Sequence, residues 1–277
     1  MNQLTLSAPA KINLTLDILG ARPDGYHEME MVMQSVSLHL GFPGGVRAES
    51  GLRFLPNDKS NLAVAAALAF RRTTGQTWKD LRISLTKRIP VCAGTAGGSS
   101  DAAAVLRGLN TLTGAGLSPQ ELAKIGEEVG SDVPYCVLGG TALAQGRGET
   151  LSPLPPLPDC FLVLCKPRFS ISTPALFRTW DKAKRHLRPD TRGVIAALER
   201  GDLVALAQRM FNVFEAVLPP HQHRDIEGIK TTLFQAGALG AAMSGSGPTV
   251  FGLFSQEAAA RKAVTVLQED YDEVYLT

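Results

Sequence analysis

The chain has 277 residues, which is enough for one large domain or two ordinary ones. Hydrophobic residues make up 44% of it and charged residues 19%, so the composition provides for a sizeable core and excludes a disordered protein. Its 28 basic and 26 acidic residues give a net charge of +2. A dedicated nucleic-acid-binding protein normally has a much larger excess of basic residues.

The first predicted element is a strand with strict alternation from Lys11 to Ile18. Apolar residues at even positions alternate with polar ones at odd positions, which predicts one core face and one polar face. Extended segments are expected over about 29–40, 46–55, 81–87 and 136–144. A helix capped by Asn61 should run to about Thr74, and another from Asp101 to about Leu112. A third helix opens with the capping box Ser118–Glu121 and ends near residue 130.

A stiff connector is predicted near the middle of the chain. Four prolines fall between residues 153 and 158, which favours a boundary between a domain at 1–152 and another at 153–277. Later strands are expected at 161–165, 239–243, 249–254 and 273–276. Helices should begin near Thr173, Asp190, Asp202 and His221, and a last helix should be capped by Ser255. Because strands and helices are interspersed and several strands are adjacent, this order predicts an α+β fold, not a doubly wound parallel sheet.

Signals for a membrane or for export do not stand out in the sequence. The longest apolar stretch, Leu62 to Phe70, is much shorter than the roughly 20 residues of a membrane-spanning helix. Lys11 falls where a signal peptide would have its apolar region. The 4 cysteines form neither a CxxC motif nor a zinc spacing, which favours reduced thiols. We therefore expect a cytoplasmic protein.

The strongest chemical signal is the glycine-rich segment from Gly94 to Ser100. A strand, a loop of small residues and a helix form a layout that binds phosphate, because the N–H groups of the helix N-terminus point at the anion. Ser99 and Ser100 would cap the helix and offer hydroxyls to phosphate or to a magnesium ion. An ordinary glycine turn with serine caps is the alternative. The Walker A and G-x-G-x-x-G fingerprints are absent.

Other signals have ordinary structural explanations beside the functional ones. Residues 98–102 (GSSDA) are a near miss to the nucleophile elbow of serine hydrolases. His221 and His223 could be half of a metal site or a solvated pair. A basic run over 178–192, diluted by Asp181 and Asp190, could contact an anion or form a solvated helix face. Alone, Asp132 suggests a turn or cap residue, and Lys11 a solvent-facing position in a strand.

Several segments together resemble the GHMP small-molecule kinases. Three of them match that family in chain order: 9–14 (PAKINL), 90–102, and 243–248 (MSGSGP). Residues 9–13, 22–27 (RPDGYH), 130–134 (GSDVP) and 171–177 (ISTPALF) resemble the family members that act on a diphosphocytidyl sugar alcohol. The resemblance implies a two-domain α+β fold with the active site in the cleft between the domains. It also implies transfer of the γ-phosphoryl group of ATP, with Mg²⁺, to the 2-hydroxyl of that alcohol in the non-mevalonate isoprenoid pathway.

The resemblance also implies roles for individual residues. Lys11 and Asp132 match the catalytic pair: Asp132 would accept the hydroxyl proton, and Lys11 would stabilise the developing alkoxide. Tyr26 and Phe177 would be the stacking faces of a cytosine pocket and His27 its hydrogen-bonding edge, while Asn13 and Thr173 would also bind this substrate. The loop that would bind ATP comprises Pro90, Val91, Cys92, Ala93, Gly94, Thr95, Ala96, Gly97, Gly98, Ser99 and Ser100.

One departure from the family concerns this loop, which in relatives is a nearly continuous glycine run. Here Cys92, Ala93, Thr95 and Ala96 replace much of it. A positive φ at any of these four would cost roughly 1–2 kcal/mol.

Two functions from other classes compete with the kinase: a non-catalytic RNA-binding module and a serine hydrolase that uses Ser100. Salt-dependent RNA binding would favour the first, and labelling of Ser100 by a fluorophosphonate the second. For the kinase we expect a small-molecule substrate, no nucleic-acid or membrane partner, and a monomer or a homodimer.

Overall fold

The computed structural model describes residues 4–36, 44–46, 49–50, 60–78, 81–85, 89, 93–183 and 187–277. The chain divides into two compact units that alternate along the sequence. Unit 1 comprises Met1–Lys11, Ser35–Val91 and Ala96–Gly139, and unit 2 comprises Ile12–Gln34, Cys92–Thr95 and Gly140–Thr277. The chain passes several times between these two compact units, whereas the predicted domains 1–152 and 153–277 are separated at a single point of the chain. The predicted domain boundary stays a prediction.

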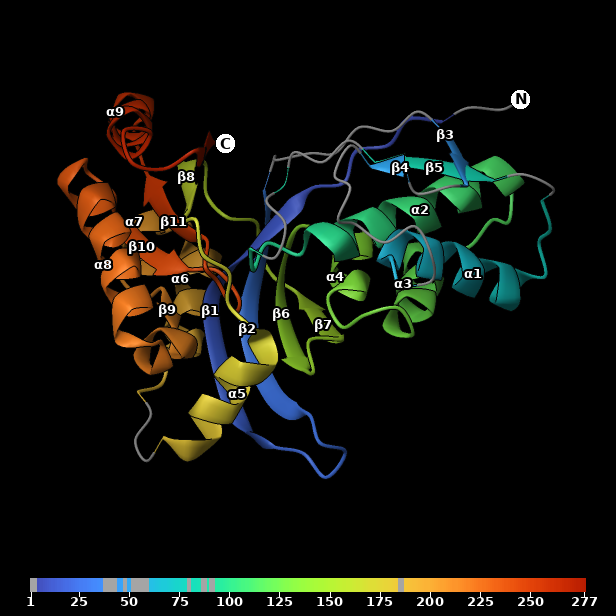
Figure 1. Ribbon diagram of the computed structural model, residues 1–277, viewed down its shortest axis with the longest axis horizontal. Helices are drawn as coiled ribbons and strands as arrows, with labels where there is room; N and C mark the ends of the chain where they lie inside the picture. Colours follow the sequence, from blue (N-terminus) through green and yellow to red (C-terminus); the bar gives the residue numbers. More distant parts are fainter. Residues whose placement is uncertain are drawn as a thin grey trace. The chain divides into compact units, whose positions relative to one another are not determined.

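Unit 1 is built mainly from helices. They are α1 (Leu62–Thr74), α2 (Gly97–Thr113), α3 (Pro119–Glu127) and α4 (Val133–Leu138), and α2 packs against the other three (Figure 1). The predicted caps of α1 and α3 are confirmed: Asn61 accepts a hydrogen bond from the Ala63 backbone, and Ser118 and Glu121 form a capping box. Three short strands, β3 (Gly44–Val46), β4 (Glu49–Ser50) and β5 (Arg82–Leu85), pair in the order β3-β5-β4.

The strand predicted over 136–144 is wrong in its first half. Residues Val133–Leu138 form α4, and only Thr141–Gly146 form a strand, β6. A short apolar run that is buried on all sides has no periodicity that distinguishes a helix from a strand. Pro134 in the first turn favours the helix, and Gly139 ends it with a φ of 70°. Asp132 therefore precedes a helix.

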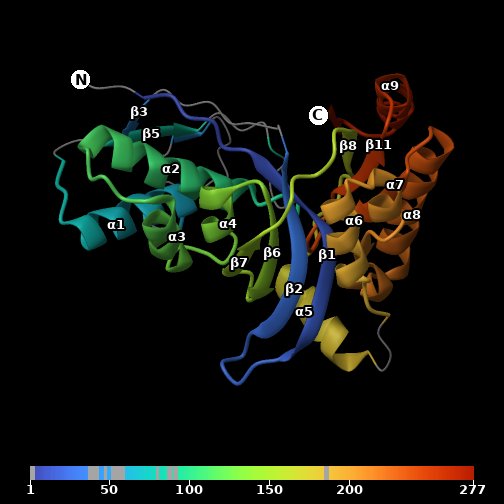
Figure 2. The same cartoon turned by 180° about the vertical axis from the view of Figure 1, so that it is seen from behind.

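Unit 2 contains most of a five-stranded sheet in the order β7-β6-β2-β1-β9. Its strands are β1 (Ala10–Ala21), β2 (His27–Val36), β6, β7 (Thr150–Pro153) and β9 (Phe211–Asn212). β1 and β2 form a long hairpin (Figure 2), β6 pairs antiparallel with β2, and β9 pairs parallel with β1.

β1 has the predicted polar face, but both of its faces are buried. Its polar residues Lys11, Asn13, Thr15 and Asp17 are all at most 5% exposed. The alternation correctly separates two faces, but it carries no information on whether the second one is covered. Buried polar groups need partners, and Thr15 Oγ1 accepts a hydrogen bond from Val32 N at 3.1 Å. Asp17 accepts one from Arg188 at 2.9 Å.

A second sheet lies wholly in unit 2. It joins β8 (Phe161–Lys166), β10 (Gly240–Met243), β11 (Val250–Phe254) and β12 (Glu273–Leu276) in the antiparallel order β10-β11-β8-β12. Helices α8 (Pro220–Gln235) and α9 (Glu257–Leu267) pack on this sheet and against one another (Figure 1). The cap of α9 is Gln256, so the prediction of a Ser255 cap is off by one residue.

The remaining elements of unit 2 are short. They are α5 (Thr173–Lys182), α6 (Thr191–Arg200), α7 (Leu203–Ala207) and the 3₁₀ helix η1 (Val213–Val217). The interspersed helices and the two mainly antiparallel sheets confirm the predicted α+β class. Within the described ranges, none of the helices has the length and apolarity needed to cross a membrane.

Candidate active site

The structure brings Lys11 and Asp132 together within unit 1. Lys11 Nζ lies 3.7 Å from Asp132 Oδ2. Lys11 is near the start of β1, with a side chain 5% exposed, and Asp132 is the residue before α4, with a side chain 32% exposed. The solvent-facing interpretation of Lys11 is therefore wrong. A buried ammonium group requires a nearby counter-charge, and the carboxylate that provides it also has an accessible side.

The Asp132 carboxylate is not used to cap a helix. Asp132 occupies the N-cap position of α4, but its side chain accepts no capping hydrogen bond. A distance of 3.7 Å to Lys11 is also longer than the usual 2.7–3.2 Å of an N–H···O hydrogen bond. The carboxylate oxygens can therefore accept a hydrogen bond from a ligand.

Neighbouring side chains hold α4 in place behind Asp132. Arg107 on α2 donates a hydrogen bond to the Cys136 carbonyl at 2.7 Å, which satisfies a group in the last turn of α4. Ser100 Oγ donates to the Pro9 carbonyl at 2.6 Å and lies 3.5 Å from Cys136 Sγ. Burial, with a smaller contribution from Asp132, raises the pKa of the Cys136 thiol to about 12. Cys136 is therefore a protonated packing residue.

The glycine-rich segment leads into α2 in a way that corrects the predicted caps. α2 begins at Gly97 and its N-cap is Ala96, without a capping side chain, so Ser99 and Ser100 lie inside the first turn. Ala96 has a φ of 55°, which makes it the one non-glycine residue with a positive φ among the described residues. The strain anticipated for the residues that replace glycine therefore falls on Ala96. Pro90, Val91 and Cys92 lie outside the described residues.

In unit 2 the segment Ala93–Thr95 is built against the loop Ser244–Pro248. Ser244 Oγ donates to the Gly94 carbonyl at 3.0 Å, and Thr249 N donates to the Ala93 carbonyl at 3.2 Å. Gly94 has a φ of +76°, and a Cβ there would lie 2.0 Å from the Ser244 carbonyl oxygen. Two sequence motifs that are about 150 residues apart thus form one structure, and Gly94 is required by this close backbone contact.

Asn212 fixes this loop and was missed by the sequence analysis. Its Nδ2 donates hydrogen bonds of 2.7 Å to the carbonyls of Met243 and Gly245, and its Oδ1 accepts one of 3.0 Å from Phe214 N. Asn212 is 2% exposed, so these bonds satisfy a side chain that would otherwise be costly to bury. A single asparagine after an apolar residue gives no sequence signal for such a role.

A second group of predicted residues meets around α5 in unit 2. The rings of His27 and Phe177 are stacked with centroids 4.5 Å apart, and Phe214 packs its edge against Phe177 at 5.0 Å. His27 Nε2 lies 2.7 Å from Asp181 Oδ1. Thr173 Oγ1 lies 2.8 Å from Ser246 Oγ. Phe214, Asp181 and Ser246 were not predicted as members of this group.

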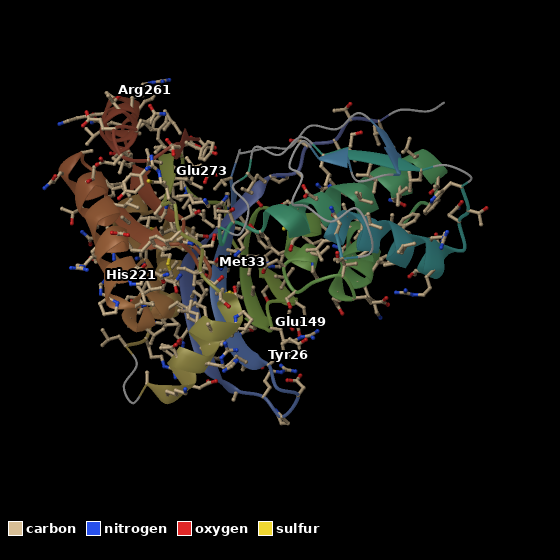
Figure 3. The ribbon with its side chains drawn as sticks, viewed as in Figure 1. Tyr26, Met33, Glu149, His221, Arg261 and Glu273 are labelled. Atoms are coloured by element: carbon tan, nitrogen blue, oxygen red, sulfur yellow. The ribbon has the colours of Figure 1, made fainter. Side chains whose placement is uncertain are left out.

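The other two predicted substrate residues lie differently. Tyr26 is 53% exposed, and the Arg147 guanidinium lies over its ring at 5.1 Å from the ring centroid. Figure 3 shows Tyr26 and Glu149 at neighbouring turns, and Glu149 forms the ion pair with Arg147. Asn13 is fully buried, and its Nδ2 lies 3.4 Å from Met31 Sδ.

Two alternative sites lack the geometry they need. Ser100 is 1% exposed and its hydroxyl is bonded to Pro9, which does not fit an accessible nucleophile. Groups of three or more His, Cys, Asp or Glu residues able to hold a metal ion are absent from the part of the chain that the structure describes. His221 and His223 therefore lack the partners of a metal site there.

Comparisons with known proteins agree with the motifs. The model of the GHMP kinases N terminal domain matches residues 61–140, and that of the GHMP kinases C terminal matches 194–273. A 4-diphosphocytidyl-2-C-methyl-D-erythritol kinase of Alkaliphilus metalliredigens (strain QYMF) is 43% identical over 282 residues, covering 100% of this chain and 96% of the relative. The kinase of the same name from Moorella thermoacetica (strain ATCC 39073 / JCM 9320) is 45% identical over 285 residues, covering 100% and 99%.

Solved structures agree as well. A crystal structure of 4-(cytidine 5'-diphospho)-2C-methyl-D-erythritol kinase has a TM-score of 0.80 at 33% identity and covers 99% of this chain and 98% of its own. The homoserine kinase from Cytophaga hutchinsonii ATCC 33406, at 21% identity and a TM-score of 0.73 over 100% of this chain and 95% of its own, shares the fold. These matches favour the kinase over the RNA-binding module and the serine hydrolase. The chain belongs to the GHMP kinases and, within them, to the family of the 4-diphosphocytidyl-2-C-methyl-D-erythritol kinases, and it is an ATP-dependent small-molecule kinase.

Proposed function

We propose that the enzyme transfers the γ-phosphoryl group of ATP to the 2-hydroxyl of 4-diphosphocytidyl-2-C-methyl-D-erythritol in the non-mevalonate isoprenoid pathway. The relatives that match the whole chain are kinases named for this compound. The observation that carries the chemical part of the proposal is the buried Lys11 ammonium 3.7 Å from the partly exposed Asp132 carboxylate.

In this proposal Asp132 is the general base. Phosphoryl transfer needs an oriented nucleophile, a group that accepts its proton, and stabilisation of the developing charge. The Asp132 carboxylate is neither engaged in a helix cap nor within hydrogen-bonding distance of Lys11, so it can accept the proton of the substrate hydroxyl. The Lys11 ammonium then stabilises the alkoxide that forms beside it, and its burial strengthens that interaction.

The N-terminus of α2 is the proposed site for the phosphates of ATP. α2 is a helix of 17 residues that begins without a capping side chain, so its positive end is available to an anion. Gly97 and Gly98 in its first turn leave room for close approach.

Mg²⁺ is proposed to arrive with the nucleotide. Mg²⁺ is usually held by one or two protein groups together with substrate phosphates, and dedicated protein cages are unusual. The described residues contain no group of three or more ligating side chains, which fits such a phosphate-held ion. Ser99, half-buried in the first turn of α2, is the protein ligand that we propose. The ion would neutralise charge on the transferring phosphoryl group.

The stacked His27 and Phe177 rings are the proposed binding site for the cytosine base. Aromatic faces supply sequence-tolerant stacking of about 1–3 kcal/mol per base, and the polar edge of His27 would supply discrimination. The free and buried thiols of Cys136 and Cys165 are typical of a reducing compartment, so we also propose that the enzyme acts in the cytoplasm.

Phosphorus NMR of the wild-type protein with ATP, magnesium and candidate alcohols tests the proposed reaction. We expect a new phosphomonoester signal with 4-diphosphocytidyl-2-C-methyl-D-erythritol and none with mevalonate or homoserine. Phosphorylation of mevalonate or homoserine in its place would refute the proposed substrate.

Variants of the pair test the proposed mechanism. Asp132→Asn should lower kcat by about 10²- to 10⁴-fold, the usual effect of removing a general base, with ATP affinity nearly unchanged. Lys11→Met should likewise lower kcat more than it weakens nucleotide binding. Asp272→Asn makes the same chemical change at an exposed carboxylate paired with Arg168 and should leave kcat unaltered. Unchanged turnover in Asp132→Asn would leave this residue with a structural role only.

A further inference from the structure

A carboxylate lies against the ring of His27 and belongs to the helix that carries Phe177. Asp181 and Phe177 are four residues apart on α5, so their side chains lie on the same face of the helix. Asp181 Oδ1 is 2.7 Å from His27 Nε2, and the side chains of His27 and Asp181 are 12% and 48% exposed. One helix thus provides both the face on which the imidazole stacks and the group that bonds to its edge.

This hydrogen bond determines which nitrogen of a neutral His27 ring carries the proton. An ionised carboxylate can only accept hydrogen bonds, so the proton lies on Nε2. In a neutral imidazole the other nitrogen, Nδ1, is then an acceptor without a proton. Nδ1 forms no hydrogen bond with any other residue in the described ranges of the chain.

The aromatic contacts restrict the plane of the ring. His27 and Phe177 have an interplanar angle of 21°, and Phe177 is in turn held by the edge of Phe214 at an angle of 87°. The stack fixes the tilt of the imidazole, and the bond to Asp181 fixes its rotation within that plane. The acceptor Nδ1 is thereby presented in one direction.

We propose that Asp181 is a positioning residue that determines the choice of nucleobase, because it keeps His27 in the Nε2–H tautomer with Nδ1 as an acceptor. Cytosine carries an amino group at C4, which donates hydrogen bonds, whereas uracil has a carbonyl there, which accepts them. The acceptor Nδ1 can pair with the amino group of cytosine. Opposite uracil it faces the lone pairs of a carbonyl oxygen and is left without a hydrogen bond. The resulting preference for cytidine over uridine should be about 5- to 150-fold. The inference rests on the proposed function, since it takes the base to be part of the substrate.

A double-mutant cycle on the preference tests this assignment. We would measure kcat/KM for the cytidine substrate and for its uridine counterpart in wild type, Asp181→Ala, His27→Ala and the double variant. Asp181→Ala should remove most of the cytidine preference, and it should have no further effect when His27 is already alanine. Asp272→Ala removes an exposed carboxylate of the same unit and should change nothing. An unchanged preference in Asp181→Ala, or fully additive effects in the double variant, would overturn the assignment.

A spectroscopic measurement separates this inference from the proposed reaction. The ¹⁵N shifts of the His27 ring, identified by loss of the signal in His27→Ala, report which nitrogen is protonated in the full-length wild-type protein. We expect a protonated Nε2 and an unprotonated Nδ1, and a protonated Nδ1 in the neutral ring would overturn the inference. If the wild type phosphorylates neither substrate, the proposed function fails while this tautomer can still be read. If it phosphorylates both equally well, the kinase stands and the specificity role of Asp181 fails.

Discussion

Replacement of Gly94 by alanine tests whether the glycine-rich segment depends on the Ser244–Pro248 loop. Gly94 has a φ of +76°, and a Cβ at this position would lie 2.0 Å from the Ser244 carbonyl oxygen and 2.9 Å from the Gly247 backbone nitrogen. Both atoms are backbone, and the Asn212 side chain holds the same loop through two hydrogen bonds. The loop therefore cannot yield by a side-chain rotation.

The expected destabilisation has two parts. A left-handed conformation costs an alanine roughly 1–2 kcal/mol, and forcing one extra carbon into a packed site costs roughly 1–3 kcal/mol. Together they lower the free energy of unfolding by about 2–5 kcal/mol, which corresponds to a fall in Tm of about 4–20 °C for a chain of this size. The affinity for ATP should fall as well, because the displaced loop leads directly into α2.

Thermal unfolding followed by circular dichroism, with ATP affinity from calorimetry, measures both effects. Gly98→Ala is the matched control for the stability measurement, because Gly98 has helical backbone angles and the nearest atom to its new Cβ is the flexible Leu62 Cδ1 at 3.3 Å. That variant should be neutral or gain up to about 1 kcal/mol of stability from helix propensity. A Gly94→Ala protein with the same Tm as the wild type would refute the reasoning.

Three other predictions concern single residues. Ala96→Gly removes left-handed strain of about 1–2 kcal/mol, while the added entropy of the unfolded chain costs about 0.4–1 kcal/mol. Urea denaturation should therefore show unchanged or slightly higher stability, and a clear loss of stability would show that Ala96 is not strained. Phe177→Ala should weaken binding of cytidine and uridine substrates alike in calorimetry, by about 1–3 kcal/mol, because the lost stacking is common to both bases and the bond to Asp181 still holds the edge of His27. A loss confined to one base would show that the stack on Phe177 is also needed to position His27. Because burial raises the pKa of the Cys136 thiol to about 12, iodoacetamide at pH 8 should modify it only after unfolding, and rapid labelling of the native protein, located by mass spectrometry, would show that the thiol is accessible.

Features set by a few adjacent residues could be predicted from the sequence. The Asn61 cap and the Ser118–Glu121 capping box depend on side chains within three residues of one another, and both are confirmed. The strand Glu273–Leu276 is found with its predicted bounds. The motifs also identified Lys11 and Asp132 as partners, although these residues are far apart in the chain.

Features that depend on distant partners could not be predicted in this way. Ser100 does not cap α2, because the helix begins at Gly97, and its hydroxyl bonds to the distant carbonyl of Pro9. The roles of Asn212 and Asp181 appear only when the chain has brought the Ser244–Pro248 loop and His27 beside them. The alternation in β1 showed which residues share a face, but the burial of both faces follows from tertiary packing.

The position of β1 has a consequence for how the protein is made on the ribosome. Thr15 pairs with Phe211 and the buried Asp17 bonds to Arg188, partners that are synthesised about 170 to 200 residues later, or about 9–40 s at 5–20 residues per second. During that interval the nascent hairpin of β1 and β2 exposes an unpaired edge and polar groups that the native state buries. The emerging chain should therefore be a substrate for ribosome-associated chaperones, and slower translation should prolong its vulnerability to aggregation.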